Sequence, residues 1–368
     1  MRRLSWIFAV PVLCIAFLFC PPTTAHAQSK TIEISPDISF AIGGSFQTRV
    51  SYVRSDGPRG DIDATGFGVR RARLVYRVNI GDRWGLNFQN ELTGVAPSLI
   101  DLFVTYRIND RLSLRTGRLP DAQPRAYLLS PYPLSDSFDR ANIARRWGAD
   151  TIGNDGRDFG LSAHYETETS RILLFLHNGD GAWTSSKTSS VISGPGTDDR
   201  PGVAVSVYGE HRPANLTNVE VGAFVGYNAE KPDRTRGRNY TSYAAHVYYG
   251  RVPGSQPLRL KLDVIGVLYE EESAAAPDQH TLGANFLAAA LVTPNLEAFA
   301  QLERRYFDVQ NASESEAFVT IGLNASLAPT LPGAFNNQRI TLAYEYMTTD
   351  LAMGDERQSV VLQLQLVF

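Results

Sequence analysis

The sequence predicts an all-β protein, a transmembrane antiparallel β-barrel of about 16 strands with one long constriction loop folded inward. Three observations predict this fold class. Apolar and polar residues alternate along most of the chain, the chain begins with an export signal, and short and long connections alternate between strands. In the last strand, Leu364 and Phe368 lie on one face, and Gln363 and Gln365 lie on the other. Repeated many times, such strands indicate an apolar exterior and a wet interior.

The first 27 residues have the three parts of a secretory signal peptide. Two arginines at the start are followed by a short apolar run over 4–20 and by Ala-His-Ala at 25–27, a cleavage site of small residues. We expect cleavage after Ala27 and one mature domain, 28–368. The alternative, a single membrane anchor, fits less well because the run is short and contains Pro11.

Composition excludes several kinds of chemistry. Both cysteines, Cys14 and Cys20, lie in the signal, so the mature chain has no thiol for a disulfide, a metal site or a nucleophile. No later segment is apolar enough for a transmembrane helix, so the membrane assignment depends on strands. The formal net charge of -3 gives no indication of a nucleic-acid partner. We expect no cofactor, no metal and no catalytic residue.

Turn residues divide the alternating pattern into sixteen expected strands, and an even number suits a closed barrel with both ends on one side. The expected strands are 37–54, 66–80, 83–93, 99–107, 111–118, 158–168, 171–178, 201–211, 217–229, 239–251, 257–270, 279–293, 295–308, 313–327, 338–348 and 357–368.

The connections support the same fold. Every second connection is a short turn, such as 81–82, 109–110 and 294–295, and most of those between are longer. Short periplasmic turns and long outer loops alternate in this way in exported barrels, whereas a soluble β-sandwich has no reason to show it. The link at 328–337 departs from the trend.

Charge predicts which face of a strand points inward. A charge on the lipid face costs about 2–4 kcal/mol at mid-membrane, so Arg71, Arg73 and Arg77 should face the interior. The same argument places Arg259 and Lys261 inside. Aromatic residues near strand ends suit interfacial girdles, or are ordinary strand residues. They are Tyr52, Tyr106, Tyr248 and Tyr306.

The longest connection, 119–157, follows the fifth expected strand and is long for an unstructured surface loop. A barrel of about sixteen strands is too wide for side chains to fill, so we expect a water-filled interior. We expect this loop to fold into the lumen and form a constriction. The alternative is an outer loop that faces other molecules.

Arginines are concentrated in this loop and in the wall beside it. Arginine keeps its charge and presents a planar set of donors to oxyanions, and several sites in series let an anion pass without being trapped. The candidate pore and anion-binding residues are Arg49, Arg71, Arg73, Arg77, Arg115, Arg118, Arg125, Arg140, Arg145, Arg146 and Arg157.

Acidic residues oppose these arginines, so an alternative is that Arg–Asp pairs only hold the loop against the wall. The acidic candidates are Asp121, Asp136, Asp139, Asp150 and Asp155 in the loop, and Glu297, Glu303 and Glu345 across the barrel.

Four motifs resemble the phosphate-selective porin O/P family over the first half of the chain. They are 68–74 (GVRRARL), 118–120 (RLP), 137–140 (SFDR) and 156–160 (GRDFG). The resemblance implies a sixteen-stranded homotrimeric channel whose lumen arginines guide anions such as phosphate. Phosphate-selective members also use pore lysines, and this chain has only four lysines, which leaves a general porin as an alternative.

We therefore expect an outer-membrane porin for passive diffusion of small anionic solutes such as phosphate or polyphosphate. Expected partners are outer-membrane lipid, small anions, two further copies of the chain in a homotrimer, and the barrel assembly machinery, reached through the C-terminal strand ending in Phe368. The alternative from another class is an outer-membrane barrel enzyme, a lipase or protease, although no Ser–His–acid spacing is visible.

Overall fold

The structure is a computed structural model that describes residues 30–368 with gaps. The gaps are 58–59, 95, 130–131, 153–154, 180, 182–203, 217, 230–238, 271–278, 310–313, 329–333 and 351–355. The expected signal, 1–27, lies outside the described residues, and cleavage after Ala27 stays a prediction.

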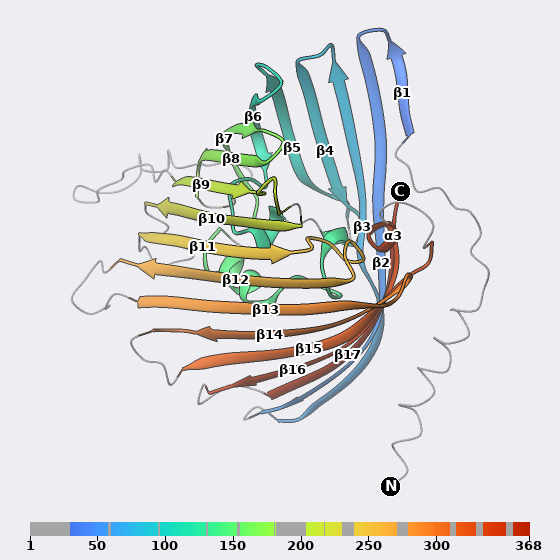
Figure 1. The fold of residues 1–368 in the computed structure, drawn as a ribbon, viewed down its shortest axis with the longest axis vertical. Coiled ribbons are helices and arrows are strands. Elements are labelled where there is room, and N and C mark those ends of the chain that lie inside the picture. Colours follow the sequence, from blue (N-terminus) through green and yellow to red (C-terminus); the bar gives the residue numbers. More distant parts are fainter. Residues whose placement is uncertain are drawn as a thin grey trace.

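Sixteen antiparallel strands, β2 to β17, form a closed barrel (Figure 1), which confirms the predicted fold class. Each strand pairs with the next, and β17 pairs with β2, so the ring has no free edge. The strands are β2 (Ile38–Asp56), β3 (Ile62–Ile80), β4 (Trp84–Glu91), β5 (Ser98–Arg107), β6 (Leu112–Leu119), β7 (Asp158–Glu166), β8 (Ser170–His177), β9 (Ala204–His211), β10 (Val219–Asn228), β11 (Tyr240–Tyr249), β12 (Leu258–Tyr269), β13 (Gln279–Thr293), β14 (Leu296–Tyr306), β15 (Ser315–Ser326), β16 (Gln338–Thr349) and β17 (Glu356–Val367).

The faces of the strands follow the predicted alternation. On β12, Leu260 and Leu262 are exposed on the outside, whereas Arg259 and Lys261 are buried inside. Tyr248 corrects one expectation. It is buried, and its hydroxyl donates to Asp263 at 2.6 Å, so it faces the lumen and does not belong to an aromatic girdle.

A further strand, β1 (Lys30–Ser35), was not predicted. It forms a hairpin with the first residues of β2, beyond the point where β17 ends. The last residue of the chain completes the β17–β2 seam, because Phe368 and Gly44 exchange two backbone hydrogen bonds of 2.8 and 3.0 Å. A Cβ at position 44 would lie 2.6 Å from the Phe368 ring, so this close approach requires glycine.

The loop between β6 and β7 lies inside the barrel (Figure 1), as predicted. It contains the helical turns η1 (Arg125–Leu129) and η2 (Tyr132–Leu134) and the helix α2 (Asn142–Asp150). Another short helix, α3 (Ala334–Asn337), precedes β16. None of the helices in the described ranges is long and apolar enough to cross a membrane.

Part of the interior is apolar, which corrects the expectation of a wholly wet lumen. On the loop, Trp147 and Tyr127 pack in a buried cluster with Phe175, Tyr208 and Phe224 from the inner wall of β8 to β10. Burying these side chains drives the loop against that side of the barrel. Most of the space left for water therefore lies on the other side.

Candidate functional site

A cavity of about 460 Å³ lies inside the barrel, between the loop and the first half of β2, with β3 and β4 beside it. Four arginines line it, and Asp101 is the only acidic side chain among its lining residues. The arginines are Arg73 and Arg77 from β3 and Arg140 and Arg157 from the loop. Positive charge therefore predominates on its wall.

The four arginines differ in how far their charge is balanced. Arg73 pairs with Glu91 at 2.7 Å, and Arg157 pairs with Asp101 at 2.5 Å. Arg77 is exposed and forms no ion pair with any described residue. It is therefore the most solvent-exposed of the four arginines.

Next to the cavity, three arginines surround the Asp139 carboxylate of the loop. Arg49 lies 3.1 Å from it, Arg70 3.3 Å and Arg71 2.9 Å. Burial alone would raise the pKa of Asp139, but the three guanidinium groups outweigh this effect and hold the pKa well below its usual range. Asp139 therefore stays ionised and fastens the loop to β2 and β3.

The ring of Tyr132 separates this cluster from the cavity. The guanidinium carbons of Arg71 and Arg140 lie 3.1 and 3.5 Å from the ring centroid, so close that they must occupy opposite faces. Burial opposes ionisation of the phenol, but Arg140 and Arg71 outweigh it and lower the pKa of Tyr132 to about 8. A tyrosine beside this cavity can thus gain charge near physiological pH.

A second acidic residue of the loop is held on the opposite wall. Asp136 contacts Arg259 at 2.5 Å and Lys261 at 2.7 Å, both on β12. From β16, Arg339 donates to the carbonyl oxygen of Ser135 at 2.8 Å. The segment 135–139 therefore spans the interior from β12 to β3.

The remaining predicted arginines lie away from the cavity. Arg118 pairs with Asp155, Arg125 with Glu220 and Arg146 with Glu316, at 2.5, 2.9 and 2.7 Å respectively. For these three, the geometry favours the alternative in which ion pairs hold the loop to the wall.

Two predicted arginines form no ion pair with the described residues. Arg145 is exposed on α2 and donates to Asn142 over 3.5 Å. Arg115 lies over the ring of Phe103, 5.8 Å from its centroid.

Arg70, Arg305 and Arg339 face the lumen, although sequence reasoning did not select them. Strand periodicity places Arg70 opposite to Arg71, but the register between β2 and β3 shifts at this point, and this bulge brings both to Asp139. No sequence signal marked the shift. Arg305 shares a strand face with Glu297 and Glu303 on β14, and Arg339 shares one with Glu345 on β16, so two-residue periodicity from these acidic candidates could have identified both.

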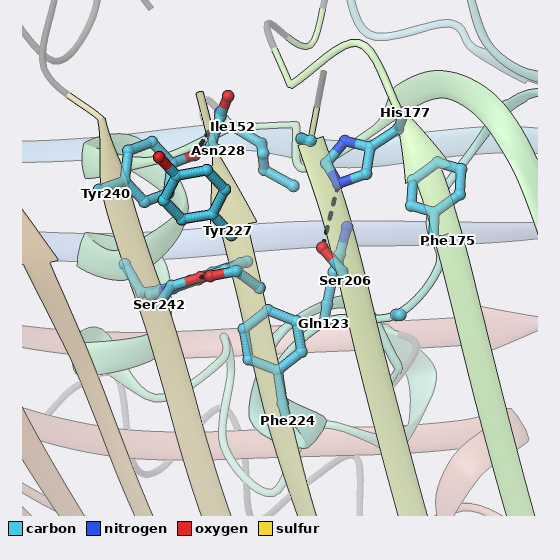
Figure 2. Close-up of a pocket in the computed structure, with 14 residues that line it drawn as sticks. Gln123, Ile152, Phe175, His177, Ser206, Phe224, Tyr227, Asn228, Tyr240 and Ser242 are labelled. Carbon is cyan, nitrogen blue, oxygen red and sulfur yellow. Dashed lines mark hydrogen bonds between the residues drawn. The ribbon is translucent and has the colours of Figure 1, made fainter. Parts of the chain in front are cut away.

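A Ser–His–Asp arrangement also lies in the interior, near the loop ends of β8 and β9, and Figure 2 shows its serine and histidine, Ser206 and His177. Asp158 contacts Nδ1 of His177 at 2.6 Å, and Ser206 contacts Nε2 at 3.0 Å. The adjoining pocket has a volume of about 20 Å³, which is room for one water molecule and not for an ester. Asp158 also accepts the backbone N–H of Gly179 at 2.5 Å, so this group fastens the segment after β8.

No cluster of three or more potential metal ligands was found in the described part of the chain. No protein-family model and no curated protein matches the sequence.

Solved structures match the fold. The anion-selective porin from Comamonas acidovorans has a TM-score of 0.66 at 13% identity, over 90% of this chain and 100% of that one. OmpF of Salmonella typhi has a TM-score of 0.63 at 11% identity, over 92% of this chain and 100% of that one. OmpT of Vibrio cholerae has a TM-score of 0.62 at 10% identity, also over 92% of this chain and 100% of that one. The chain therefore has the sixteen-stranded architecture of outer-membrane porins generally, and the narrower likeness to the phosphate-selective porin O/P family stays a proposal.

Proposed function

We propose that this protein is an outer-membrane porin through which small anionic solutes, including phosphate and polyphosphate, diffuse passively. The observation that carries the proposal is the cavity beside β3, whose lining holds four arginines and one aspartate. Charges of one sign on a low-dielectric wall raise the local concentration of the opposite ion. The arginine row of β3, from Arg70 to Arg77, would extend this field over roughly 23 Å of the strand.

The comparisons support the proposal at the level of class. The matched structures include an anion-selective porin, an OmpT described as expressed in the outer membrane and an outer-membrane channel, DcaP of Acinetobacter baumannii. One matched OmpT structure is described as a trimer form, which supports a homotrimer for this chain. The terminal Phe368 lies beside Gly44 at the seam, consistent with the proposed recognition of the last strand by the barrel assembly machinery.

A general porin without ion preference is the second candidate. It is favoured by the ion pairs that balance Arg118, Arg125 and Arg146 and leave them little charge for solutes. The two candidates differ in selectivity and not in architecture.

Reconstitution in a planar bilayer under a KCl gradient tests the proposal. We expect steady channels whose reversal potential shows anion preference, and Arg77→Gln should reduce that preference because Arg77 is the exposed arginine of the cavity and forms no ion pair with a described residue. Arg146→Gln, away from the cavity, is the matched control. A reversal potential of zero would support the general porin, and cation preference would contradict the proposal.

A further inference from the structure

The three arginines around Asp139 carry more charge than this carboxylate balances. Asp139 is the only acidic side chain within ion-pair distance of Arg49, Arg70 or Arg71 in the described ranges. One negative charge therefore faces three positive charges in a largely buried cluster. Removing charges from water is costly unless they are matched, so this excess favours a ligand of higher negative charge.

The same cluster offers an unused donor and a solvent-facing side. Arg71 is 1% exposed, and its buried Nε has no hydrogen-bond partner among the described residues. The side chain of Arg70 is 38% exposed. Planar guanidinium groups suit oxyanions such as phosphate, which present more acceptor oxygens than a carboxylate does.

Building on the proposed function, we propose that Arg49, Arg70 and Arg71 form an oxyanion-binding site that Asp139 fills when no solute is bound. A doubly charged oxyanion displaces Asp139 from this site. Since Asp139 fastens the loop to β2 and β3, its displacement removes the ion pairs at this end of the segment 135–139 and leaves there the hydrogen bond from Arg49 to the carbonyl oxygen of Phe138. Asp136 still holds the other end on β12. Solute binding and loop anchoring are therefore in competition.

A cysteine reporter tests the displacement directly. Ser137 is 4% exposed, and its hydroxyl has no hydrogen-bond partner in the described structure, so Ser137→Cys disturbs little. The expected mature chain has no other cysteine. In the mature protein, which lacks Cys14 and Cys20, inorganic phosphate should raise the rate at which an uncharged thiol reagent modifies this cysteine, by at least about fivefold over chloride of equal ionic strength. An unchanged or slower rate would overturn the inference.

A second measurement uses the chloride current through single channels. Asp139→Asn removes the internal competitor, so the phosphate concentration that halves the current should fall at least about fivefold. Asp136→Asn is the matched control, since it loosens the same segment without touching the three arginines, and it should shift this concentration by less than about twofold. Equal shifts in both variants would refute competition at this site.

The reversal potential of the unaltered protein separates the two claims. If the reversal potential shows anion preference while phosphate does not change the rate of thiol modification, only the proposed displacement of Asp139 fails. If it shows no anion preference, the proposed function fails.

Discussion

Tyr132 shows how single side chains set the charge beside the cavity. Its ring lies between the guanidinium groups of Arg71 and Arg140, which stabilise the phenolate more than burial destabilises it. In its neutral form the residue adds no negative charge beside the two arginines. In its ionised form it cancels part of that charge.

We predict that anion preference falls as the pH rises through about 8, because the pKa of Tyr132 is lowered to about 8 and ionisation adds a negative charge. The reversal potential in a KCl gradient, measured between roughly pH 6.5 and 9.5, should show this step. Tyr132→Phe should remove the step and keep the anion preference of the low-pH form. A step of the same size in the phenylalanine variant would assign the titration to another group.

At the scale of secondary-structure elements, α2 depends on the barrel wall for its N-terminal cap. Ala141 precedes the helix and offers no side-chain cap, so the first N–H groups need another acceptor. Glu303 of β14 supplies it, accepting from the backbone of Ile143 at 2.9 Å and from the side chain of Asn142 at 3.1 Å. A carboxylate here also suits the positive end of the helix.

We predict that Glu303→Ala lowers the free energy of unfolding by about 0.5–2 kcal/mol, the range measured for the loss of a helix cap. Urea unfolding in lipid vesicles measures this loss. Single-channel recording should show larger current fluctuations, because α2 is less firmly held. Glu356→Ala, an exposed residue at the start of β17, is the control and should leave both measurements unchanged. Equal losses in the two variants would contradict the capping role of Glu303.

For the whole molecule, the sequence predicted the barrel well because alternation reports a boundary between apolar and wet surroundings. The first half of β12 was assigned correctly since leucine and charge strictly alternate over 258–263. β8 could not be interpreted in this way, because Leu173 and Phe175 face inward against the loop while Leu174 faces outward. An apolar loop core and an apolar membrane look alike in sequence, so the dry part of the lumen was not foreseen.

The candidate site was predicted less completely than the fold. The arginines were selected by type, but their ion-pair partners depend on a loop path that spacing does not specify. Arg70 lies beside Arg71 through a register shift, and Asp139 reaches both from a segment that Asp136 holds on β12. Long-range pairing of this kind follows from three-dimensional packing and not from local pattern.

The loop fills the part of the lumen that faces β8 to β12, so removing it should widen the channel. We predict that deletion of 125–150 raises the single-channel conductance several-fold, because the deleted segment includes Trp147 and the residues that span the interior. It should also lower the free energy of unfolding, since Phe175, Tyr208 and Phe224 would then face water. Trp147→Ala, which leaves the loop in place, should destabilise the barrel by about 3–5 kcal/mol with a smaller change in conductance. An unchanged conductance in the deletion variant would show that the constriction lies elsewhere, whatever the loss of stability.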